Sequence, residues 1–284
     1  AVMVSTTNGD GLPDRLPIVG WFDHVIVRAT VDGATYWMDG ARVGDRDLAD
    51  LTPPDYRWAL PVRADGAALL PIDLPPLSAP TVESVVDVDA SSGLDAEVPF
   101  VFSLIYRGDA AVQARQQFGA VPRDQMETQM RAQMNGQAGA ARMDSFDTRY
   151  DDDANTFQMT IRAHGRQSWV ATSGGRVLGF PEAAIAIPHQ PKREGLQAPY
   201  ADLPYTLAHP WMTRMTIRVV LPNGGEGFQL EGGDQSLEAG GYRIDRRAAM
   251  ADGVATVSST IVSLAPEISA ADMDQARRRA AALG

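Results

Sequence analysis

The chain has 284 residues, of which 44% are hydrophobic and 21% charged, a composition typical of an ordinary soluble globular protein. Its formal net charge of -11 argues against nucleic acid as a partner and against docking on anionic lipid, because both need clustered Lys and Arg. The absence of cysteine excludes disulfides, thiolate metal sites and a thiol nucleophile within this chain.

The first sixty residues carry short β runs separated by turns. Ala1 to Val4 lacks the features of a signal peptide and is typical of the middle of a strand, so we expect the chain to start inside a domain. Phe22–Val31 and Ala34–Met38 are predicted strands that flank Asp32-Gly33, the strongest short-range signal for a β-hairpin. We therefore assign residues 1–60 to a first domain, although we expect that they cannot close a core of their own.

A proline-rich stretch follows, and we interpret residues 61–80 as an extended linker because proline stiffens the chain and donates no backbone hydrogen bond. Residues 81–284 form the second predicted domain. No apolar run approaches the length of a membrane span, so we expect no membrane insertion.

The second domain is predicted to be mainly β with a helical insertion. The expected strands are Glu97–Arg107, an alternating run from Phe157 to Ala163, Trp211–Leu221, Gly227–Leu230, Tyr242–Met250 and Val254–Leu264. The expected helices are Asp109–Gln117, Pro122–Met134 and a C-terminal helix with Ser269 as its N-cap. The predicted fold class is α+β, mainly β: strands of a core segment followed by a β-sandwich with inserted helices and a terminal helix.

A histidine and an aspartate are predicted to meet across the first hairpin. If Asp32-Gly33 forms a two-residue turn, Ile26 lies opposite Asp39, and His24 shares its face and lies diagonal to Asp39. Diagonal neighbours have Cβ atoms roughly 7–8 Å apart, within reach of an imidazole and a carboxylate. A carboxylate on one imidazole nitrogen leaves the other nitrogen free to take a proton, which is the orienter and base half of a nucleophilic triad. The alternative interpretation is a structural histidine on a strand and an aspartate in a turn.

The phrases Phe22-Asp23-His24-Val25 and Tyr36-Trp37-Met38-Asp39 resemble the His and Asp strands of bacterial transglutaminase-like cysteine enzymes. The motifs cover only residues 20–60, and the remainder is similar in architecture alone. In that superfamily a helix bearing the cysteine comes before the two strands. The usual Asp-Pro-Thr is Asp39-Gly40-Ala41 here, which leaves the geometry of this loop open.

The resemblance implies a truncated papain-like core and acyl transfer or amide hydrolysis through a thioester, with His24 as base and then acid and Asp39 orienting it. It implies two partners, the missing N-terminal part carrying the cysteine and a protein or peptide substrate. It also implies an exported, periplasmic location in a bacterium. The competing hypothesis is a non-catalytic β-sandwich module that binds or scaffolds and keeps the His and Asp as a relic.

Other candidate site residues carry weaker signals. Trp21, next to the His strand, is expected to line a substrate cleft or, as the commoner role, to fill a core. Asp151-Asp152-Asp153 with Asn155 resembles a calcium loop, but the glycine and glutamate of that motif are replaced by Thr156 and Arg162. We therefore predict neither a metal site nor a cofactor.

Overall fold

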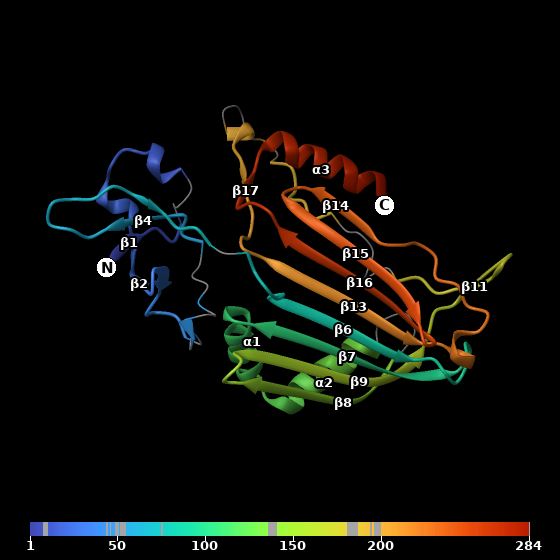
Figure 1. The fold of residues 1–284 in the computed structure, drawn as a ribbon. Helices are drawn as coiled ribbons and strands as arrows, with labels where there is room; N and C mark the ends of the chain where they lie inside the picture. The colour runs from blue at the N-terminus through green and yellow to red at the C-terminus, as the bar shows by residue number, and fades with distance from the viewer. Residues whose placement is uncertain are drawn as a thin grey trace. The chain divides into compact units, whose positions relative to one another are not determined.

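The computed structural model describes residues 1–7, 11–43, 45, 47–48, 51, 55–74, 76–135, 141–180, 187–193, 195 and 200–283. The chain forms two compact units, Ala1–Ser78 and Ala79–Gly284. Each unit has its own sheet and its own buried cluster of apolar side chains, so each is described by itself (Figure 1).

The first unit is built on a five-stranded antiparallel sheet with the order β3-β2-β1-β4-β5. The strands are β1 (Val2–Val4), β2 (His24–Val31), β3 (Ala34–Met38), β4 (Trp58–Pro61) and β5 (Leu70–Pro71). Two short 3-10 helices, η1 (Leu12–Asp14) and η2 (Val19–Trp21), lie between β1 and β2. The central strand β1 therefore joins the predicted hairpin to segments that follow it in the chain.

The predicted hairpin is confirmed. Asp32 and Gly33 have φ of 51° and 81°, the positive values that a tight two-residue hairpin turn requires. The ladder then pairs Val31 with Ala34 and continues in the predicted register to Val27 with Met38. Asp39 is the first residue after the end of this ladder, so its side chain is placed by the register of β2 and β3.

The core of this unit needs residues beyond position 60. The buried cluster comprises Val2, Val4, Ile26, Trp37, Tyr56, Ala59 and Ile72, with Leu74 packed against it. The prediction that 61–80 is only a linker is therefore wrong, because Pro61 ends β4, Pro71 ends β5 and Ile72 completes the core. Proline is tolerated here because β5 is a two-residue strand at the edge of the sheet, where a missing N–H donor costs little.

The opposite face of the same sheet is apolar and open. Val25 and Val27 are 56% and 47% exposed, and Val31 is 40% exposed. Met3 pairs with Val25 on one side and with Leu60 on the other, so these three side chains form a row across the sheet. We call this surface the valine face; it lies on the side away from Ile26 and the buried cluster.

The second unit is built on one eight-stranded sheet with the order β14-β15-β16-β13-β6-β7-β9-β8 (Figure 1). The strands are β6 (Val82–Asp89), β7 (Glu97–Arg107), β8 (Arg142–Asp151), β9 (Thr156–Arg166), β13 (Met212–Val220), β14 (Gln235–Ala239), β15 (Tyr242–Ala251) and β16 (Val254–Ser263). Two small sheets pair β10 (Val170–Thr172) with β11 (Gly175–Val177) and β12 (Tyr205–Thr206) with β17 (Glu267–Ile268). Within the large sheet, the pairing of β6 with β13 is parallel and the other pairings are antiparallel.

Helices and loops pack on this sheet. Helices α1 (Asp109–Gly119) and α2 (Arg123–Asn135) pack on β7, β8 and β9, and α3 (Ala270–Leu283) contacts β14 at the other end (Figure 1). The fold-class prediction, α+β and mainly β with inserted helices and a C-terminal helix, is confirmed. Its sandwich-like layering comes from these helices and loops on one large sheet.

The second-unit strands and helices predicted from the sequence are present except for one, whereas β6, β8 and β14 of the large sheet were not predicted. Phe157, Met159, Ile161 and Ala163 are all buried on one face of β9. Ser269 is confirmed as the cap of α3, because its Oγ accepts the Asp272 N–H at 3.1 Å. The described part of the chain contains no helix that is both long and apolar enough to cross a membrane.

The predicted strand Gly227–Leu230 is wrong. The segment follows η6 (Pro222–Gly225) as irregular backbone, and Gly225 and Gly227 both have φ of 82°. A positive φ interrupts extended backbone, so Phe228 and Leu230 pack on the core from a loop.

Candidate active site

His24 and Asp39 meet in the first unit, as the hairpin register predicts. His24 Nε2 lies 2.9 Å from Asp39 Oδ2. The carboxylate can only accept, so Nε2 carries a proton and donates, and in the neutral imidazole the lone pair is then on Nδ1. Within the described residues nothing hydrogen-bonds to Nδ1, and the His24 side chain is 26% exposed. The pair therefore holds a partly exposed imidazole in one orientation, with Nδ1 unpaired among the described residues.

Asp39 is buried, with a side chain only 3% exposed, and three donors hold it. Besides His24, the Tyr56 hydroxyl donates to Oδ2 at 2.8 Å and the Ala41 N–H donates to Oδ1 at 2.9 Å. Burial alone would raise the pKa of Asp39, but the hydrogen bonds from Ala41, His24 and Tyr56 outweigh it and hold the pKa below its usual value. Asp39 is thus ionised at neutral pH and available to stabilise an imidazolium.

The structure shows the geometry of the Asp39-Gly40-Ala41 loop after β3, which the sequence left open. The Ala41 N–H bond to the Asp39 carboxylate closes a turn in which an aspartate side chain bonds to backbone two residues on. Arg42 N–H also donates to the Asp39 carbonyl at 3.1 Å. Gly40 and Ala41 therefore form a compact turn that fixes the carboxylate.

The other end of the pair is fixed through Asp23. Its carboxylate accepts the Thr6 N–H at 2.8 Å and the Thr6 hydroxyl at 2.6 Å, and its own N–H donates to the Val4 carbonyl at 3.2 Å. These bonds join the end of β1 to the residue preceding His24. Asp23 and Tyr56 were not among the predicted site residues; Asp23 lies within the Phe22-Asp23-His24-Val25 phrase, but Tyr56 comes from a distant loop with no local signal.

Trp21 ends η2, three residues before His24 in the chain. Its indole N–H donates to the Leu16 carbonyl at 3.0 Å, and the Arg15 guanidinium lies 5.0 Å from its ring centroid. Trp21 is half-buried and outside the buried cluster of this unit. With its donor occupied, Trp21 offers a ring surface, and its role in substrate binding stays a prediction.

The second unit contains a serine close to a histidine, but that pair is structural. Ser263 Oγ lies 3.0 Å from His209 Nδ1, yet it also accepts the Trp211 N–H at 2.8 Å and donates to the Trp211 carbonyl at 3.2 Å. Ser263 is only 6% exposed. Its hydroxyl is therefore occupied by backbone groups and shielded from a substrate.

The acidic turn between β8 and β9 is also structural. Asp151 Oδ1 accepts the N–H groups of Asp153 and Ala154 at 3.1 and 3.0 Å, which orders the turn. In the part of the chain that the structure describes, no three His, Asp or Glu side chains gather in a way that could hold a metal ion.

Comparisons with known proteins give no assignment: no family model matches the chain, and no curated protein or solved structure matches it. The geometry around His24 is therefore the main basis for a functional proposal.

The hydrogen bond from Tyr56 to Asp39 should have a measurable effect on the pKa of Asp39 and on stability. Tyr56→Phe removes one donor to the Asp39 carboxylate, so we expect the pKa of Asp39 to rise. In the wild type, the lowered pKa of Asp39 stabilises the folded state at any pH above the pKa that Asp39 has in the unfolded chain. This stabilisation is lost as the pH falls through the pKa of Asp39 in the folded state. The variant should therefore lose about 1–2 kcal/mol of first-unit stability at neutral pH, and less in acid.

Carboxyl ¹³C chemical shifts across a pH titration, with urea unfolding at pH 7 and pH 3, measure both effects. Tyr36→Phe is the matched control, because Tyr36 lies on β3 on the face opposite to Trp37 and Asp39. An Asp39 titration unchanged by Tyr56→Phe would show that the hydroxyl does not stabilise the carboxylate.

Proposed function

We propose that His24 and Asp39 are the base and orienter of a transglutaminase-like thiol acyltransferase or protease whose cysteine lies on a segment preceding this chain. The observation that carries the proposal is the partly exposed imidazole held through Nε2 by a buried carboxylate, with Nδ1 unpaired among the described residues. This is the arrangement by which a base activates a nucleophile. The resemblance of the two strands to that superfamily supports it further.

In the proposed reaction His24 Nδ1 takes the proton from the thiol, and the thiolate attacks an amide carbonyl of a protein or peptide. The resulting imidazolium, stabilised by Asp39, returns the proton to the leaving amine as the C–N bond breaks and a thioester remains. An amine or a water molecule then attacks the thioester and gives its proton to Nδ1; as the C–S bond breaks, the leaving thiolate takes that proton back from the imidazolium and the thiol is restored. The chain contains no cysteine, so alone it is expected to be inactive.

The valine face is consistent with a larger assembly. Val25 and Val27 are exposed on one side of β2 while Ile26 is fully buried on the other. Val25, Val27 and Val31 make one whole side of this strand apolar, and an apolar sheet face open to water is typical of a surface that another segment or partner covers. We expect the first unit to be stabilised by the cysteine-bearing segment. An exported bacterial location belongs to the same proposal and has only the resemblance to support it.

The decisive test is to read the coding sequence upstream of Ala1 and to express that segment separately. The proposal expects a helix that opens with cysteine a few dozen residues before His24. Mixing this segment with the chain should raise the melting temperature of the first unit by several degrees. An upstream region without cysteine would contradict the enzymatic proposal and favour the binding or scaffold module.

A further inference from the structure

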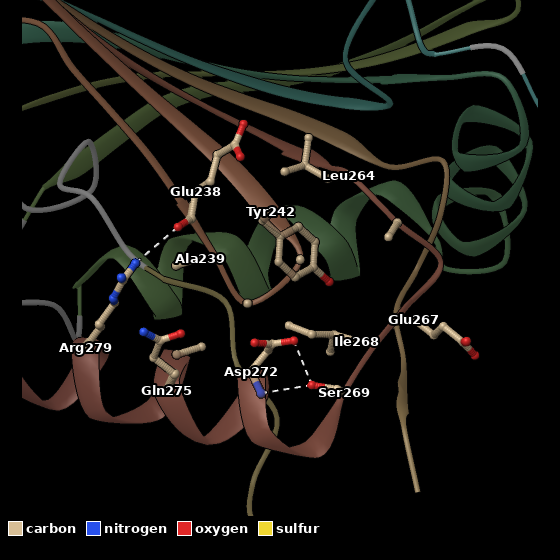
Figure 2. Close-up of a pocket in the computed structure, with 14 residues that line it drawn as sticks. Glu238, Ala239, Tyr242, Leu264, Glu267, Ile268, Ser269, Asp272, Gln275 and Arg279 are labelled. Carbon is tan, nitrogen blue, oxygen red and sulfur yellow. Dashed lines mark hydrogen bonds between the residues drawn. The ribbon is translucent and has the colours of Figure 1, made fainter.

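A cavity of about 450 Å³ lies in the second unit, between the first turns of α3 and the turn joining β14 to β15 (Figure 2). Strand β17 and Leu264 form its remaining wall. This volume falls within the usual range for small-molecule and side-chain binding sites, roughly 300–1,000 Å³. The cavity takes no part in the His24 site.

The walls of the cavity are fixed by close backbone packing. Gly240 and Gly241 form the turn with φ of 64° and 82°. A Cβ on Gly240 would lie 2.7 Å from the Pro188 carbonyl oxygen, and one on Gly241 would overlap the Leu207 side chain. On the opposite wall Ser269 caps α3 through the Asp272 N–H. The cavity is therefore built by the fold and does not depend on mobile side chains.

Tyr242 is the feature that points to a ligand. It is only 9% exposed, and its ring packs edge-on against Trp211 with centroids 5.7 Å apart. Its hydroxyl has no hydrogen-bond partner among the described residues and points into the space above α3 (Figure 2). The ring is buried while Tyr242 lines the cavity, so the hydroxyl is placed to bond to a molecule bound there. Burial raises the pKa of Tyr242, so the hydroxyl stays neutral at physiological pH.

The charged side chains around the cavity determine whether a bound molecule should be a cation or an anion. Figure 2 shows the Asp272 carboxylate facing the space below Tyr242, whereas the carboxylates of Glu238 and Glu267 point away from it and the Arg279 guanidinium lies toward the Glu238 carbonyl. The Arg279 guanidinium donates to the Glu238 carbonyl at 3.3 Å, and the Asp272 carboxylate accepts the Ser269 hydroxyl at 2.7 Å. An acidic residue thus already occupies the start of α3, where an anion would otherwise be favoured. A cation is the complementary ligand.

We propose that this cavity binds a primary ammonium group on an aliphatic stem, as in a lysine side chain of a partner peptide or protein. The ammonium donates to the Tyr242 hydroxyl oxygen and is neutralised by the Asp272 carboxylate, while the stem packs on Ile268 and the Tyr242 ring. An ammonium has three donors and no acceptor, which fits a site made of a hydroxyl and a carboxylate.

The test uses the whole chain and a matched pair of probes, Nα-acetyl-lysine methylamide and its norleucine analogue, which lacks the ammonium. We expect the lysine probe to bind with a dissociation constant on the order of 1 mM and to shift the backbone amide signals of Gly240, Gly241 and Ile268 in NMR spectra. The norleucine probe should bind at least about tenfold more weakly.

Tyr242→Phe removes only the hydroxyl and keeps the ring against Trp211, so the fold should be retained. It should weaken lysine-probe binding roughly three- to tenfold. Tyr106→Phe is the control, because Tyr106 lies in β7 of the same sheet and burial also raises its pKa. Equal binding of the two probes, tighter binding of Nα-acetyl-glutamate methylamide, no binding of the lysine probe, or unchanged affinity in Tyr242→Phe would each overturn the proposal.

Discussion

In the thiol enzyme that we propose, His24→Gln should lower turnover about 10³-fold or more and slow the alkylation of the proposed cysteine by iodoacetamide at pH 7. Glutamine keeps a donor that can reach Asp39, so the buried carboxylate remains hydrogen-bonded and the fold should persist. What is lost is the proton acceptor at Nδ1, without which the thiol stays protonated and a poor nucleophile. The rate of cysteine alkylation by iodoacetamide, followed by mass spectrometry, measures this loss of reactivity directly.

The matched control is His164→Gln. His164 Nδ1 also pairs with an aspartate, Asp144, but on the surface of the second unit, where both side chains are more than 30% exposed. That variant should leave both rates unchanged. Full activity in His24→Gln, with its melting temperature preserved, would remove His24 from the mechanism.

Gly253→Ala should destabilise the second unit by about 2–4 kcal/mol. Gly253 closes the turn between β15 and β16 with φ of 74°, and an added Cβ would lie 2.8–2.9 Å from three backbone atoms of Gly224. All three contacts are with backbone atoms, so no rotamer change relieves them. The Leu221 N–H bond to the Gly253 carbonyl at 2.8 Å holds the two turns together.

Gly227→Ala isolates the conformational part of that cost. Gly227 has φ of 82° and lies in the same unit, but a Cβ there would meet nothing within 4 Å. We expect a loss of only about 1 kcal/mol, the cost of a left-handed backbone for alanine. Calorimetric melting of both variants gives the comparison, and equal losses would mean that the turns do not interlock.

The His24–Asp39 pair could be predicted because the register that brings the two side chains together is set locally. The Asp32-Gly33 turn sets the register, and the alternation of side chains along two strands then decides which residues share a face. Tyr56 could not be predicted in the same way. It reaches Asp39 from a loop before β4, through a contact that depends on β1 lying between β2 and β4.

The two wrong predictions, the linker over residues 61–80 and the strand Gly227–Leu230, have the same origin. The proline-rich segment has the composition of a linker. Pro61 and Pro71 nevertheless lie in strands, and the core of the first unit includes Ile72. Gly227–Leu230 was predicted as a strand, but Gly225 and Gly227 both have a left-handed backbone, and the turn around Gly253 packs closely on Gly224 and Gly225. In each case packing between distant segments overrides a local preference.

The valine face also governs how the chain behaves during handling. With a net charge of -11, molecules repel one another in dilute buffer, and this repulsion keeps them apart at a distance. Ammonium sulfate screens this charge. It also strengthens hydrophobic association through the exposed side chains of Val25, Val27 and Val31. Salting out should therefore begin at this sheet, and a low-salt anion-exchange step suits the chain better than precipitation.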